Sequence, residues 1–157
     1  MEGYEQYFGS GELATRLRGN IAESACCDYF GIPRVREVIK GGDDGSDFYL
    51  GAWRCQSKNS SFQSYGEHRT ELKTNRCNKY EFREKELDII ILSYFPQIPV
   101  DQVIPWVQLL GWIDPKTFEA RCFRTGYSYG GRWAVKDTQL FPMEDLWRLW
   151  QRVRGDL

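Results

Sequence analysis

The sequence predicts a single α/β domain that spans residues 1–157, with a mixed central sheet flanked by helices. Apolar residues recur every four positions in Glu12–Phe30, which indicates an amphipathic helix. The near-continuous apolar run Leu87–Phe95 is typical of a central strand that is buried on both faces. Between these segments, two β-rich stretches flank Gly51-Ala52, a pattern that favours a hairpin with a tight turn.

The elements of the first half follow from local signals. Gly31 and Pro33 end the first helix, because glycine ends helices readily and proline cannot continue them. Arg34–Ile39 is expected to be a short strand, and a glycine-rich loop follows it. Asp47–Leu50 and Trp53–Lys58 are then the two arms of the hairpin.

The second half is less regular. The polar segment Asn59–Asn78 is expected to form an exposed loop or a poorly ordered arm, and Tyr80–Arg83 an edge strand. Val107–Ile113 and Trp133–Val135 are candidate strands beside the central one. Pro142 opens the last helix, whose tryptophans are expected to pack against the core.

Composition narrows the class of protein. Hydrophobic residues make up 41% and aromatic residues 15% of the chain, which indicates a globular domain. No apolar run approaches the roughly 20 residues that cross a bilayer, and the first residues lack the plan of a signal peptide, so a soluble cytoplasmic protein with no membrane partner is expected. Five cysteines without a Cys-x-x-Cys pair argue against a zinc site. His68 is the single histidine, which disfavours Ser-His-Asp catalysis and leaves a Cys77–His68 pair as an open alternative.

The hairpin gathers the residues that can do chemistry. Side chains alternate along a strand, so Gln56 and Lys58 project to the same face. A turn at Gly51-Ala52 brings Asp47 back beside the end of the second arm. A carboxylate, an amide oxygen and an ammonium group at one sheet edge suit phosphodiester hydrolysis with Mg²⁺, which prefers oxygen ligands.

These residues resemble the motif of the PD-(D/E)XK (restriction-endonuclease-like) nuclease superfamily. The resemblance covers roughly Gly19–Phe95: a helix that carries an acid at Glu23, Gly45-Ser46-Asp47 at the start of the hairpin, Gln56-Ser57-Lys58 on its second arm, and a later core strand. It implies a restriction-endonuclease-like core and an Mg²⁺-dependent endodeoxyribonuclease, similar to those of phages, mobile elements or homing introns.

The resemblance also implies roles for individual residues. Asp47, Gln56 and the main-chain carbonyl of Ser57 would bind Mg²⁺, for which Mn²⁺ would substitute. Lys58 would be the catalytic lysine and Glu23 the helix acid. Gln56 stands where most members carry Glu or Asp, which removes one negative charge and predicts weaker metal binding. Other acids also compete for these roles: Asp43 and Asp44 in the preceding loop for the metal aspartate, and Asp88, which could instead be a buried acid of the core strand.

A basic strip accompanies the candidate site. The net charge is −1, yet Arg54–Lys85 holds eight Lys or Arg against four Glu. Such a strip suits a protein that holds double-stranded DNA, although a solvated charged face gives the same pattern. The expected DNA contacts are Arg69, Lys73, Asn75, Arg76 and Lys79. Cutting both strands would require a homodimer or homotetramer. The alternative is an inactive member of the same fold that binds DNA without a metal.

Overall fold

A mixed four-stranded sheet forms the centre of the protein. A computed structural model describes residues 12–34, 47–60, 70–75, 77–95, 106–125 and 131–155. The strand order is β1 (Phe48–Leu50), β2 (Trp53–Ser60), β4 (Ile89–Tyr94) and β5 (Gln108–Ile113). β1 and β5 run antiparallel to their neighbours, whereas β2 and β4 are parallel. The predicted mixed sheet is confirmed, and the apolar run at 87–95 provides its inner strand β4.

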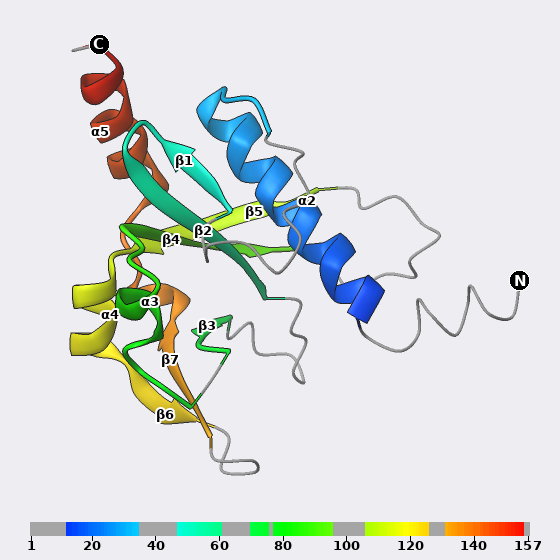
Figure 1. Cartoon of the computed structure of the whole chain (residues 1–157), viewed down its shortest axis with the longest axis vertical. Helices are drawn as coiled ribbons and strands as arrows, with labels where there is room; N and C mark the ends of the chain where they lie inside the picture. The colour runs from blue at the N-terminus through cyan, green and yellow to red at the C-terminus, as the bar shows by residue number, and fades with distance from the viewer. Residues whose placement is uncertain are drawn as a thin grey trace, which may run out of the picture.

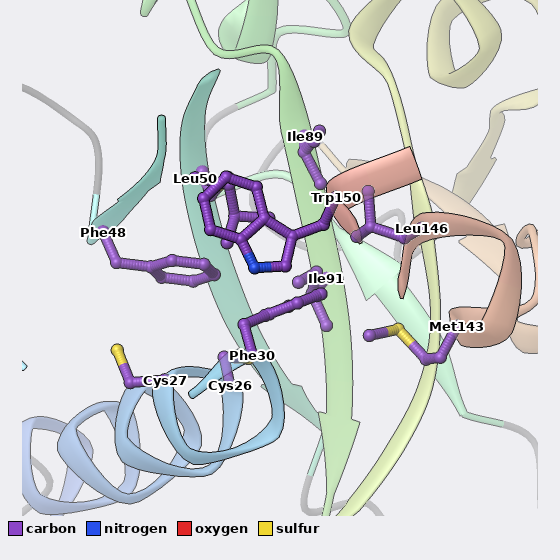
Figure 2. Packing of buried hydrophobic residues seen from close by; sticks show 11 residues of the cluster. Cys26, Cys27, Phe30, Phe48, Leu50, Ile89, Ile91, Met143, Leu146 and Trp150 are labelled. Atoms are coloured by element: carbon purple, nitrogen blue, oxygen red, sulfur yellow. The ribbon is translucent and has the colours of Figure 1, made fainter. Parts of the chain in front are cut away.

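Two helices cover one face of this sheet (Figure 1). They are α2 (Glu12–Phe30), with the bounds that the apolar periodicity predicts, and α5 (Met143–Gly155). Figure 2 shows the core between them, where the indole of Trp150 lies among side chains from α2, β1 and β4. The buried members of this cluster are Cys26, Cys27, Phe30, Phe48, Leu50, Cys55, Ile89, Ile91, Met143, Leu146 and Trp150. Trp150 therefore packs into the core as expected, whereas Trp147 stacks on Phe30 but stays exposed.

A smaller sheet covers the opposite face (Figure 1). Its strands, in the order β3 (Glu71–Lys73), β7 (Arg132–Lys136) and β6 (Phe123–Thr125), are antiparallel. The short helices α3 (Glu81–Glu84) and α4 (Pro115–Arg121) lie beside it. A second core joins the layers and consists of Leu72, Phe82, Leu87, Ile90, Leu92, Ile113, Phe118 and Val135. The described part of the chain thus has three layers, with β2 and β4 in the middle one.

The hairpin forms as expected. Leu50 pairs with Trp53, and Gly51-Ala52 make the two-residue turn between them. Gly51 has φ +61°, a conformation that glycine adopts without the steric cost that a Cβ would bring. Phe48 and Leu50 turn toward the first core, which anchors the hairpin against α2 and α5.

Two predictions for the segment after the hairpin are wrong. The expected loop Asn59–Asn78 contains strand β3, in which Leu72 is fully buried, because a partner strand some sixty residues later pairs with it. The expected edge strand Tyr80–Arg83 is instead the start of helix α3. Asn78 causes this change: its carbonyl accepts the N–H of Glu81, and its side-chain Oδ1 accepts the N–H of Tyr80, which bends the chain into a helical turn.

The remaining elements agree with the sequence or add to it. Strands β5 and β7 confirm the candidate strands in the second half. Helix α4 and strand β6 were not anticipated, and neither was the 3₁₀ turn η2 (Asp137–Gln139). Most of the expected strand Arg34–Ile39 and the glycine-rich loop after it lie outside the described residues. No helix in the described ranges is both long enough and apolar enough to cross a bilayer.

Candidate functional site

Asp47 lies at the open end of the hairpin and is tied to β2 by both backbone and side chain. Its N–H donates to the carbonyl of Cys55 (2.8 Å). Its Oδ2 accepts the main-chain N–H of Ser57 (2.8 Å) and the Ser57 hydroxyl (3.2 Å). The Asp47 carboxylate thus accepts the Ser57 N–H, which a backbone carbonyl would accept if the β1–β2 ladder continued beyond Phe48. The fold places Asp47 next to the Gln56-Ser57-Lys58 segment, as the sequence predicts.

The backbone of Ser57 faces the same edge as this carboxylate. In a strand, the N–H and C=O of one residue point to the same side. The Ser57 N–H and the Cys55 carbonyl are both directed to Asp47, whereas the Arg54 carbonyl accepts the N–H of Asp88 on the β4 side. The carbonyl oxygen of Ser57 is therefore turned toward the edge where Asp47 sits. The carboxylate of Asp47 and the main-chain oxygen of Ser57, which the resemblance pairs as metal ligands, therefore lie at the same edge of β2.

Gln56 carries a buried amide oxygen that is not satisfied. The residue is 8% exposed and pairs with Ile90 of β4, a member of the second core. Its Oε1 has no hydrogen-bond partner in the part of the chain that the structure describes. An unmet buried acceptor costs roughly 1–3 kcal/mol, and a bound water or ion would remove that cost. Gln56 is one residue away from the Ser57–Asp47 contact, and this is the position expected for a ligand oxygen.

Lys58 lies on the same face as Gln56, two residues further along β2. Its Nζ donates to the carbonyl of Lys73 and to Oδ1 of Asn75, each at 3.0 Å. The same Nζ lies 5.2 Å from the centre of the Phe82 ring, within the range of a cation–π contact. The ammonium group is thus held between the central sheet and the segment that follows β3. This is a more constrained position than an exposed strand lysine would have.

Burial lowers the pKa of Lys58 from 10.5 to about 8. The carboxylate of Glu81 opposes this effect most strongly, and that of Asp47 does so as well, while Lys85 and Arg132 add to the lowering. A lysine with a pKa in this range remains mostly cationic at neutral pH and can also exchange a proton there. Perturbed lysines of this kind concentrate at functional sites.

Glu23 lies on α2, above the strands of the hairpin, and is half buried. Burial raises the pKa of the Cys27 thiol to about 11, and the charges of Glu23 and Asp47 both contribute to the increase. The same two carboxylates add to the rise at Cys26, where burial is again the main cause. Glu23 and Asp47 therefore act on a common region between α2 and the sheet. Cys26 and Cys27 belong to the first core, whereas Lys58 lies over Phe82 of the second core, so Glu23 faces the other side of β2 from Lys58.

The other candidate acids and nucleophiles fall elsewhere. Asp43, Asp44 and His68 lie outside the described residues, and Cys77 is exposed. Asp88 is exposed and lies just before β4, so its placement inside the core strand is wrong. Its Oδ2 accepts the N–H of Arg54 at 2.8 Å, which gives it a role at the opposite end of β2 from Asp47.

The expected DNA contacts are placed in part. Arg69 and Arg76 lie outside the described residues. Lys73 forms an ion pair with Glu71 (3.3 Å), and Lys79 lies over the rings of Tyr80 and Trp133. Asn75 is exposed, yet its amide oxygen is already engaged by Lys58. Of the three described residues, only the two lysines offer charge to a phosphate backbone.

Glu81 belongs to the surroundings of Lys58, and sequence reasoning missed it. The residue is 2% exposed. Its Oε2 accepts the main-chain N–H of Asn75 (2.8 Å), and its Oε1 is 3.2 Å from Nζ of Lys85. The only sequence signal is a glutamate one position before an apolar residue, in a segment that was expected to be a strand. Nothing in that pattern indicates that the acid is buried.

Comparison with protein-family models, with curated proteins and with solved structures gives no match for this chain. Within the described ranges, no three His, Cys, Asp or Glu side chains lie together in a way that could hold a metal ion. A metal at the hairpin would therefore depend on one fixed carboxylate and on neutral oxygens from the amide and the backbone. The donor chemistry is that of a hard cation, because every available donor is oxygen.

Proposed function

We propose that this chain is an Mg²⁺-dependent endodeoxyribonuclease of the PD-(D/E)XK kind. The observation that carries the proposal is the buried Oε1 of Gln56, which has no hydrogen-bond partner in the described structure and belongs to the residue that directly precedes Ser57, the partner of Asp47. A bound cation would satisfy this oxygen. Among the buried polar atoms without a partner in the described residues, this oxygen is the one that belongs to a proposed ligand residue.

The order of elements supports the same proposal. Helix α2 precedes the β1–β2 hairpin, and the chain then passes through α3 before it returns as β4, parallel to β2. A helix with an acid, a hairpin that carries the motif and a later core strand are what the resemblance implies. The finer assignment to the restriction-endonuclease-like core is part of the proposal.

The proposed ligands fit the metal. Asp47 would supply the charged oxygen, and Gln56 and the Ser57 carbonyl would supply neutral ones, with Glu23 acting through a bound water. Mg²⁺ binds through few protein oxygens and keeps several waters, so such a sparse set is sufficient for a weak site. The ion would supply an acidified water and charge neutralisation at the phosphate.

The chain itself would supply orientation and positive charge. Ser57 directs the Asp47 carboxylate through two hydrogen bonds. Lys58 would face the scissile phosphate and offset the charge that develops there. Lys73 and Lys79 would contact the backbone of double-stranded DNA, and a homodimer or homotetramer would place one site on each strand.

The direct test is cleavage of supercoiled plasmid DNA with Mg²⁺, with Mn²⁺ and with a chelator. We expect nicked or linear product only with a divalent ion. Lys58→Ala should abolish the product, whereas Lys116→Ala, which removes an exposed lysine from α4, should not. Cleavage that persists in Lys58→Ala, or a wild-type protein that leaves the plasmid intact under all three conditions, refutes the proposal.

A non-catalytic DNA-binding protein on the same fold is the second candidate. The observation in its favour is the low number of carboxylates at the hairpin, since the described residues include no cluster of three potential metal-binding side chains. Such a protein would bind DNA with an affinity that falls steeply with salt and does not depend on a divalent ion. Binding measured at several salt concentrations, with and without Mg²⁺, separates it from the nuclease.

A further inference from the structure

Lys58 connects the two sheets of the molecule. It starts from β2 of the central sheet, and both of its hydrogen-bond acceptors belong to residues at or just after β3 of the smaller sheet. A lysine ammonium has three N–H donors, and these two contacts use two of them. Within the described residues, one donor remains for a further partner. The two hydrogen bonds to Lys73 and Asn75 fix the ammonium group and thereby the direction of its third N–H.

The segment that holds Lys58 is itself fixed at several points. Thr74, between the two acceptors, donates its N–H to the Trp133 carbonyl of β7 (2.9 Å), and its hydroxyl accepts the Trp133 N–H (3.2 Å). Thr74 is fully buried. Asn75 donates its main-chain N–H to Oε2 of Glu81 on α3 (2.8 Å). The segment that carries both acceptors of Lys58 is thus anchored to β7 through Thr74 and to α3 through Asn75.

Glu81 is an unusual residue for a short helix on the outer layer. It is almost completely buried, and its carboxylate receives the Asn75 N–H on one oxygen and an ion pair from Lys85 on the other. A buried carboxylate needs such partners to be tolerated. Glu81 is therefore connected to the Lys58 ammonium group through Asn75, whose main-chain N–H binds Glu81 and whose side-chain Oδ1 binds Lys58.

We propose that Asn75 and Glu81 are positioning residues for Lys58: Asn75 holds the ammonium group through Oδ1, and Glu81 holds Asn75 in place. As a statement about catalysis, this rests on the proposed nuclease function. It also changes the role of Asn75, which the sequence assigns to DNA contact. Asn75 would act on the reaction through Lys58 and would leave DNA affinity nearly unchanged.

Steady-state cleavage by Asn75→Ala and Asn75→Asp tests the first step. Asp keeps an oxygen at the same distance along the side chain, so it should restore the contact. We expect Asn75→Ala to lower kcat by about ten- to a hundredfold with KM unchanged, the loss that removal of one hydrogen bond to a charged group brings. Asn75→Asp should lie within about threefold of the wild type by the same reasoning.

The matched control is Asn78→Ala. Asn78 lies in the same segment, and its side chain hydrogen-bonds to Tyr80 and Glu84, whereas Lys58 donates to Lys73 and Asn75. We expect it to lower stability without a comparable effect on kcat. An equal kcat loss in Asn78→Ala would mean that only the rigidity of the segment matters, and a raised KM in Asn75→Ala would restore the DNA-contact role; either result overturns the proposal.

The second step is tested by Glu81→Gln and Glu81→Leu. Gln keeps an acceptor for the Asn75 N–H and should retain activity, whereas Leu removes it and should reproduce the kcat loss of Asn75→Ala. Urea unfolding checks that each variant folds. If Glu81→Leu does not fold, Glu81→Gln is compared with the wild type alone. A kcat loss in Glu81→Gln as large as that in Asn75→Ala contradicts the proposal that an acceptor oxygen at position 81 holds Asn75.

A spectroscopic readout separates this proposal from the nuclease proposal. In protein labelled with ¹⁵N-lysine, the ammonium signal of Lys58 is identified by its loss in Lys58→Met. We expect this signal to shift in Asn75→Ala and to return toward the wild-type position in Asn75→Asp. A signal that does not move in Asn75→Ala overturns the holding role, even if DNA is cut. A plasmid left intact together with the expected shift refutes only the nuclease function.

Discussion

The main-chain N–H of Ser57 donates to the Asp47 carboxylate at 2.8 Å, a contact between residues ten positions apart. A matching contact lies three residues earlier in the same strand, where the N–H of Arg54 donates to Asp88, also at 2.8 Å. Strand β2 thus donates to a carboxylate on each of its two edges, at Arg54 on the β4 side and at Ser57 on the β1 side. The two acids differ in their surroundings, because Asp47 lies beside Gln56 and Lys58 while Asp88 is exposed.

This symmetry provides a matched pair of variants. Asp47→Ala and Asp88→Ala each leave a strand N–H without its acceptor, so each should lower the free energy of unfolding by about 1–3 kcal/mol, with the exposed Asp88 at the lower end. Only Asp47→Ala should also reduce cleavage, by more than about a hundredfold, because it removes the charged metal ligand. Urea unfolding and plasmid cleavage measure the two effects. Equal cleavage by both variants would remove Asp47 from the site.

Gln56 should show opposite effects on stability and activity. Gln56→Leu replaces an unmet buried acceptor with apolar atoms, so in the absence of a divalent metal it should raise the free energy of unfolding by about 1 kcal/mol. The same change should abolish cleavage. A variant that is less stable than the wild type without metal would show that the oxygen has a structural partner.

Restoring the charge at this position should strengthen metal binding. Gln56→Glu places a second carboxylate next to Asp47, which favours a divalent cation and should lower the Kd for Mn²⁺ about tenfold. Gln108→Glu, on the exposed edge of β5, adds the same charge away from the hairpin. Titration calorimetry with Mn²⁺ compares them. A similar gain in both variants would mean that net charge alone is responsible.

The stability of the metal-free protein should depend on pH through Lys58. Burial lowers its pKa from 10.5 to about 8, so between these values the unfolded chain binds more protons than the folded one. The free energy of unfolding should therefore rise with pH across this interval by roughly 3 kcal/mol relative to Lys58→Met, in which the difference is absent. Comparing the two proteins at each pH cancels the titration of the cysteines and tyrosines. A difference that stays constant from pH 8 to 10.5 contradicts the assignment.

Two glycines should respond to alanine in opposite directions. Gly19 lies in α2, and a Cβ there meets nothing within 4 Å, so Gly19→Ala should stabilise the protein by about 1 kcal/mol. A Cβ on Gly111 of β5 would come within 2.7 Å of the Phe141 carbonyl oxygen and of the Leu140 Cβ. Gly111→Ala should therefore destabilise by about 1–3 kcal/mol, because backbone must move. Thermal unfolding measures both; a stable Gly111→Ala protein would mean that the β5–Phe141 contact is looser than described.

Local patterns predicted the elements whose signals are complete within a short window. The four-residue periodicity of α2, the two-residue turn at Gly51 and the continuous apolar run of β4 each appear in the structure. Helix α4 could also have been found, since Asp114 caps it and Pro115 stands at its first turn, a common helix start. The alternation of side chains along β2 also predicts that Gln56 and Lys58 point away from the face that carries Cys55 and the first core.

The sequence by itself therefore determined the helix, the hairpin and the central strand, together with the return of Asp47 to the second arm of the hairpin. Only the tertiary structure decided that Leu72 lies in a strand, that Glu81 is buried and that Lys58 is held by Asn75. The physical reason is the distance along the chain. Periodicity and turn chemistry act over a few residues, whereas the pairing of β3 with β7 and the satisfaction of a buried charge depend on partners brought together by the packing of whole layers.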